Sequence, residues 1–136
     1  MKKILFGLMA LGLAVSYAMA HDHEGMESKN KGKEVAVTGI LVDTNCYLKD
    51  GHTNDDHDTM KACGRDCLRD GIPAGVLAGK KLYILVFPAN VFSNYAGKTV
   101  EITGDLLEGN LLLPEKAFVI EKKEKKAIKL AGKVMM

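Results

Sequence analysis

The clearest structural pattern in the chain is the segment Lys98-Thr99-Val100-Glu101-Ile102-Thr103-Gly104. Its apolar residues, Val100 and Ile102, alternate with polar ones, which is the two-residue period of a strand with one face in the core. The segment is rich in β-branched side chains, which fit a pleated, half-buried surface. We therefore expect a half-buried β-strand here.

Apolar runs bounded by glycine or proline predict further strands before and after this segment. The polar residues 43–58 are typical of a long loop. Residues 60–69 predict a short helix that Asp58 or Thr59 caps, and residues 88–97 predict a turn or helical connection. Glu108-Gly109-Asn110 indicates a hairpin turn. The expected strands cover residues 34–41 with a bend at Gly39, 81–87, 98–104, the two arms of the hairpin at 105–113, 117–121 after Pro114, and an edge strand near 127–130.

This element order predicts a mainly β fold with one short cysteine-bearing helix. Five or six antiparallel strands can form either a small barrel or a sandwich, and both alternatives stay open. The segment 95–104 looks like the strand-entry segment common in small bacterial periplasmic proteins of OB-fold-like shape. That resemblance favours an OB-like barrel.

The N-terminus has the three regions of a signal peptide in residues 1–20: Lys2 and Lys3, an apolar run, and the close Ala18-Met19-Ala20. Residues 21–33 are polar and predict a flexible arm, followed by a single β-rich domain at 34–136. Cleavage would leave a formally neutral chain, because two of the 19 basic residues go and 17 acidic ones remain. We expect a periplasmic or secreted protein with no membrane attachment after cleavage and no affinity for nucleic acid.

The chain has three cysteines, an odd number, and all of them lie with all four histidines between His21 and Cys67. In an exported protein paired cysteines normally form disulfides, so at least one thiol must be free, bound to metal or bonded elsewhere. Cys63 and Cys67 are four residues apart and share one helical face with Met60. A disulfide between them is awkward on an intact helix, so Cys46 is the natural partner.

Three elements of the sequence, in order, resemble a set of small secreted bacterial proteins of unassigned function. They are Asp43-x-x-Cys46-Tyr47, Ala62-Cys63-x-x-x-Cys67 and Gly71-Ile72-Pro73-Ala74-Gly75. The resemblance extends over residues 39–104, roughly half of the chain. Many of those proteins have a histidine one turn before the first helix cysteine, where this chain has Met60. His57 lies three residues earlier still, so the resemblance does not fix a fourth ligand.

Two interpretations of the cysteines follow. In the first, Cys46, Cys63 and Cys67 bind a metal with a fourth donor, either His57 or His52 in a zinc site, or Met60 in a Cu(I) site. Such a protein would store or deliver the ion, or be held together by it, and another periplasmic protein is a candidate partner. In the second, Cys46 forms a disulfide with one helix cysteine, the third is buried, and the protein is a binding module without catalysis.

A further metal-binding prediction concerns the new N-terminus. Cleavage after Ala20 would expose His21-Asp22-His23, whose amine, amides and imidazoles can wrap Cu(II) or Ni(II) in a square plane. No Gly-x-Ser-x-Gly, phosphate loop, dinucleotide motif or Cys-x-x-Cys occurs in the sequence, so nothing in it favours an enzyme. Asp43 is predicted to accept backbone hydrogen bonds or to orient a metal ligand.

Overall fold

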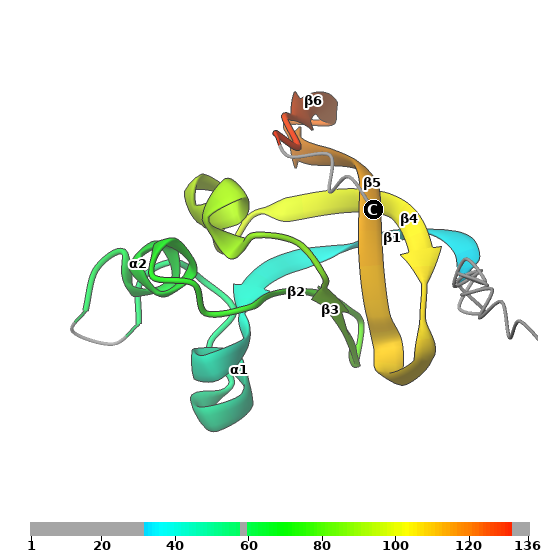
Figure 1. Cartoon of the computed structure of the whole chain (residues 1–136). Helices are drawn as coiled ribbons and strands as arrows, with labels where there is room; N and C mark the ends of the chain where they lie inside the picture. Colours follow the sequence, from blue (N-terminus) through cyan, green and yellow to red (C-terminus); the bar gives the residue numbers. More distant parts are fainter. Residues whose placement is uncertain (1–31, 58–59, 132–136) are drawn as a thin grey trace, which may run out of the picture.

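The computed structural model describes residues 32–57 and 60–131 (Figure 1). In these residues six strands form one sheet with the order β3-β2-β1-β4-β5-β6. The strands are β1 (Lys33–Asp43), β2 (Ala74–Ala78), β3 (Lys81–Leu85), β4 (Thr99–Leu106), β5 (Leu111–Glu121) and β6 (Glu124–Ile128). The helices are α1 (Thr44–Asp50), α2 (Cys63–Arg69) and the 3-10 turns η1 (Ala89–Tyr95) and η2 (Glu108–Asn110).

The sheet closes on itself. Neighbours in the sheet order pair antiparallel, and β3 pairs in addition with β5, in parallel, at Ile84↔Leu111 and Leu85↔Leu112. Strands β3, β2, β1, β4 and β5 therefore form a barrel-like ring, with β6 added outside it. The predicted mainly β fold of five to six strands is confirmed, and the described strands form no second sheet as a sandwich would need.

The core fills the inside of this ring. Val100 and Ile102 of β4 are fully buried, as their alternation predicted, and Phe92 of η1 is the largest fully buried side chain. Burial of a phenylalanine stabilises a fold by about 1.5–3 kcal/mol. The predicted helical connection at 88–97 is confirmed as η1, and its Phe92 belongs to the same core cluster as Leu41 of β1 and Leu112 of β5.

The prediction of a continuous loop at 43–58 is wrong, because helix α1 begins at Thr44. Asp43 caps this helix, since its Oδ1 accepts a hydrogen bond of 2.8 Å from the backbone N–H of Cys46. Gly51 ends the helix at a φ of 76° and donates its N–H to Tyr47 O over 2.9 Å. Both capping residues are visible in the sequence, but a helix of seven residues has too short an apolar repeat to stand out.

Two predictions about strands also need correction. Strand β2 was not expected, because it has only five residues, directly follows the Gly-Ile-Pro turn and contains two alanines and a glycine. Residues 111–121 form one strand rather than two. Pro114 is tolerated within it because the pairing of β5 with β3 ends at Leu112 and that with β6 begins at Ala117, so no second neighbour needs its missing N–H.

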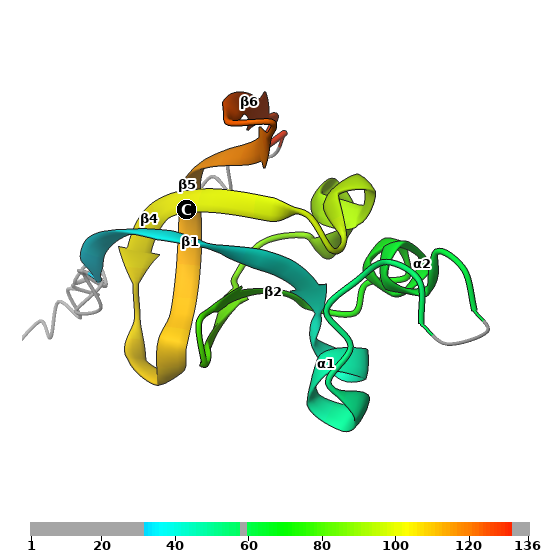
Figure 2. The ribbon, with the colours of Figure 1, turned by 180° about the vertical axis from the view of Figure 1, so that it is seen from behind.

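Helices α1 and α2 lie together at one side of the sheet, away from β5 and β6, in both views of the ribbon (Figures 1 and 2). Helix α2 is shorter than the predicted 60–69 and begins at Cys63, while the predicted caps Asp58 and Thr59 lie outside the described residues. The predicted signal peptide and almost all of the polar arm also lie outside them. None of the helices in 32–57 and 60–131 is long and apolar enough to span a membrane.

Candidate metal centre

The three cysteines meet at the helical side of the molecule. Cys46 lies in α1, Cys63 is the first residue of α2, and Cys67 follows one turn later. Their sulfur atoms all lie within 4.8 Å of one another, and none of the three forms a disulfide. Tetrahedral zinc at about 2.3 Å from each thiolate needs sulfurs about 3.8 Å apart, so a shift of at most about 1 Å would close the group around an ion.

Two aspartates hold the loop between the helices against the start of α2. Asp55 accepts the backbone N–H of Arg65 through Oδ1 over 2.8 Å, and its own carbonyl accepts the N–H of Gly64 over 3.0 Å. Asp56 Oδ1 accepts the N–H of Ala62 over 2.8 Å. These bonds satisfy donors that the first turn of a helix leaves unpaired. The loop therefore fixes the position of Cys63 relative to His57.

His57 is buried, with 3% of its surface exposed. Its Nε2 lies 2.7 Å from the carbonyl oxygen of Asn54, and because a carbonyl only accepts, Nε2 carries the proton and donates it. In the neutral ring this leaves a lone pair on Nδ1, which is buried without a hydrogen-bond partner among the described residues. Metal-binding histidines commonly donate their second ring N–H to a carbonyl in this way.

His57 belongs to a second group of candidate ligands, together with Asp43 and Cys46. One ligand atom from each of these residues lies within 4.8 Å of the other two. Asp43 is 2% exposed and its Oδ2 lies 3.9 Å from His57 Nε2. The structure thus brings the three cysteines into one group and places His57 in a second group that shares Cys46.

A pocket of about 400 Å³ opens beside both groups. The His52 ring stacks on that of His57 with centroids 4.5 Å apart. Met60 is 58% exposed and is joined to His57 by two backbone hydrogen bonds of 2.7 and 2.8 Å. His21 and His23 lie outside the described residues. Every other residue that the sequence singled out as a ligand lines this pocket: Cys46, His52, His57, Met60, Cys63 and Cys67.

The surroundings of the thiols oppose their ionisation in the metal-free protein. Burial raises the pKa of Cys46 above its ordinary value, and the hydrogen bond to Asp43 and the negative charge of this carboxylate raise it further. Burial, followed by the charge of Asp43, also raises the pKa of Cys67. At neutral pH these two thiols are protonated, so a metal ion must displace their protons when it binds.

Asp43 is the residue whose place in a ligand group the sequence analysis missed. Its predicted hydrogen bond to the backbone is confirmed by the cap of α1, but the sequence indicated at most an orienting role toward a ligand. The spacing Asp43-x-x-Cys46 is the only signal in the sequence, because an N-cap residue lies beside the third residue after it.

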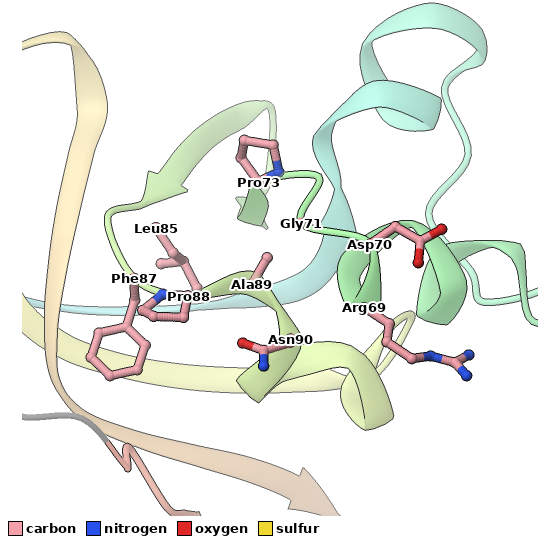
Figure 3. A pocket seen from close by; sticks show the side chains of 9 residues that line it. All are labelled: Arg69, Asp70, Gly71, Pro73, Leu85, Phe87, Pro88, Ala89 and Asn90. Carbon is pink, nitrogen blue, oxygen red and sulfur yellow. The ribbon is translucent and has the colours of Figure 1, made fainter.

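A second pocket, of about 390 Å³, lies between the end of α2 and the β3–η1 connection (Figure 3). Leu85, Ala89 and Pro73 form an apolar part, and the side chains of Arg69 and Asp70 point away from it toward solvent. None of the predicted ligands lines this pocket. Its chemistry indicates no particular ligand, whereas that of the cysteine pocket indicates a metal ion.

Comparison of the chain with protein-family models, curated proteins and solved structures finds no match in any of the three. The structural class of the protein therefore follows from its fold and its cysteine pocket alone. It is a predominantly β protein with three free thiols gathered in one open pocket. Three thiols at this spacing can bind a metal ion.

Proposed function

We propose that this protein binds a thiophilic metal ion, zinc or copper, through Cys46, Cys63 and Cys67. The observation that carries the proposal is the gathering of three sulfur atoms within 4.8 Å of one another, next to a buried imidazole with an unused lone pair. Thiolates favour Zn²⁺ and Cu⁺ over hard cations such as Mg²⁺ and Ca²⁺. Burial of His57 Nδ1 without a partner is costly unless a ligand engages it.

The openness of the pocket favours storage or delivery of the ion over a purely structural role. Structural zinc sites are closed by four protein ligands, whereas a site with three protein ligands keeps one coordination position open. Here three cysteines form the central group, and the thioether of Met60, a further soft donor, is exposed at the same pocket. We propose in addition that residues 1–20 direct export to the periplasm or the cell exterior, where another exported protein would supply or receive the ion.

The test is metal content together with thiol content. Protein purified from the periplasm without added metal is analysed by intact mass, thiol titration and elemental analysis. We expect at least one equivalent of zinc or copper per chain and three reduced cysteines once the metal is removed. Replacement by Co²⁺ should give an intense thiolate-to-cobalt absorption that Cys67→Ser weakens. One disulfide, one free thiol and no stoichiometric metal would overturn the proposal.

The same material tests export and the N-terminal chelate. N-terminal sequencing should begin at His21, and retention of residues 1–20 would contradict the proposed cleavage. Cu²⁺ added to the mature protein should give visible absorption that disappears when His21 and His23 are replaced by alanine. An unchanged spectrum would exclude the chelate without affecting the cysteine pocket.

A further inference from the structure

We propose that the pocket binds two divalent ions, and that the Cys46 thiolate bridges them. This inference rests on the proposed function, which places the first ion on Cys46, Cys63 and Cys67. The second ion would be held by Asp43, Cys46 and His57. Each of the two groups has its ligand atoms within 4.8 Å of one another, and Cys46 is the single member that they share.

The two groups supply different donors to their ions. Three thiolates form the first, whereas the second offers a carboxylate oxygen, a thiolate and an imidazole nitrogen, a set that zinc also accepts. Asp43 Oδ1 is occupied by the cap of α1, and its other oxygen, Oδ2, lies 3.9 Å from His57 Nε2, the nitrogen that donates to Asn54. The second ion would engage the ring through the lone pair of Nδ1, so the imidazole would turn toward Oδ2 when the ion binds. A fourth position on each ion is left for water or another small ligand.

An independent observation at His57 supports the second ion. Its imidazole is 97% removed from solvent, with Nε2 donating to Asn54 and Nδ1 lacking any partner in the described part of the chain. Buried polar atoms in native proteins nearly always have a partner. His57 is not grouped with Cys63 and Cys67. An ion bound also by Asp43 and Cys46 would give His57 Nδ1 a partner, and the ring would not have to move toward Cys63 and Cys67.

Charge balance also favours two ions. With metal bound, three thiolates and the buried Asp43 carboxylate carry four negative charges between them. Lys49 and Asp50 line the same pocket and offset each other. One divalent ion would leave two uncompensated negative charges beside the buried Asp43 and Cys63, which is costly. Two divalent ions leave none.

The experiment counts cadmium, a thiophilic divalent probe, in the reduced full chain. All proteins carry His21→Ala and His23→Ala, so that the N-terminal chelate does not contribute. We expect two cadmium ions per chain by elemental analysis after gel filtration. We also expect two ¹¹³Cd resonances that are coupled to each other through the shared sulfur.

Two variants assign the second ion. Asp43→Asn keeps an N-cap of equal quality for α1 but removes the carboxylate, and His57→Gln keeps a donor for Asn54 but removes the imidazole. Each should lower the count from two to one and retain the resonance of the three-thiolate ion, which also shows that the variant is folded. Asn45→Gln is the matched control, because Asn45 is exposed, lines the same pocket and belongs to neither group, and this variant should still bind two.

The outcomes separate this inference from the proposed function. Two coupled resonances in the reference chain, which has native Asp43 and His57, and the loss of one ion in both Asp43→Asn and His57→Gln, support both. One ion in the reference chain overturns the bridged pair and leaves the cysteine site standing. Two uncoupled resonances, or a His57→Gln variant that still binds two ions, likewise overturn the shared Cys46 centre. No bound cadmium overturns both proposals.

Discussion

Cys46 and Asp43 lie side by side, and the carboxylate opposes ionisation of the thiol until a cation binds. Burial and the Asp43 charge raise the pKa of both Cys46 and Cys67, so these thiols are protonated across neutral pH and each bound ion releases protons. We therefore expect the apparent zinc affinity to increase with pH, by about tenfold per pH unit for each proton displaced. Competition with a chromophoric chelator between about pH 6 and 8 measures this slope.

The sign of the effect distinguishes it from binding to ligands that are already ionised. At lower pH protons compete with zinc for the thiols and binding weakens. Binding by carboxylates alone would give an affinity that does not change with pH in this range, because carboxylates are already ionised there. Cys67→Ser removes one of the two protonated thiols and should reduce the slope by about one power of ten per unit. An affinity independent of pH would show that zinc does not displace protons from these thiols.

Ala62 has an unusual backbone conformation next to the first helix cysteine. Its φ of 57° lies in the left-handed region, where a side chain costs roughly 1–2 kcal/mol relative to glycine. The greater freedom of glycine in the unfolded chain offsets about 0.4–1 kcal/mol of this. Ala62→Gly should therefore raise the free energy of unfolding by about 0.5–1 kcal/mol in urea denaturation. Ala36→Gly, at an exposed position of strand β1, is the control and should lower it.

At the scale of elements, the pairing of strands β1 and β2 leaves no room for a side chain at Gly39. A methyl group built on this residue would lie 2.2 Å from the carbonyl oxygen of Leu77, which is backbone and cannot rotate away. Gly39→Ala should therefore lower the free energy of unfolding by about 1–3 kcal/mol. Thr38→Ala, the exposed neighbour in the same strand, should cost less than about 1 kcal/mol. Equal effects in urea denaturation would contradict the close approach.

How well each element could be predicted depends on the length of its pattern. The alternation around Val100 and Ile102 covers enough residues to fix both the strand and its buried face. Helix α1 is defined by its two caps, Asp43 and Gly51, and has hardly two turns in which a period could repeat. Strand β2 has only five residues after Pro73, and Val76 is the one β-branched residue among them, so the segment is too short to show a strand period.

The candidate site also has one part that the sequence predicted and one part that it did not. Clustering of histidines with cysteines in the sequence predicted that Cys46, Cys63 and Cys67 belong together, and the structure gathers them. Sequence spacing could not show that His57 groups with Asp43 rather than with the helix cysteines. That arrangement depends on the backbone pairing of His57 with Met60 and on the hydrogen bond to Asn54, which arise only when the loop folds back.

At the scale of the whole molecule, the ring of strands and the cysteine pocket are held together by different interactions. The ring has a continuous ladder of backbone pairs and a buried core. The pocket depends on two seven-residue helices and one loop, with no disulfide between Cys46, Cys63 and Cys67. A metal ion that binds only the folded pocket would stabilise it by about 4 kcal/mol at a thousandfold excess over its dissociation constant.

Metal removal should therefore loosen one side of the molecule and leave the other unchanged. We expect chelation to speed amide hydrogen exchange in residues 44–50 and 60–70 by tenfold or more, because local opening there no longer has to break metal–thiolate bonds. Strands β4 and β5 should keep their protection, since their pairing does not involve the ligands. Metal-free Cys63→Ser should match the chelated protein, and added zinc should restore protection only in the unsubstituted chain. Equal acceleration of exchange in the helices and the sheet would contradict this prediction and mean that the ion stabilises the whole fold. Unchanged exchange everywhere would mean that the pocket keeps its structure without an ion.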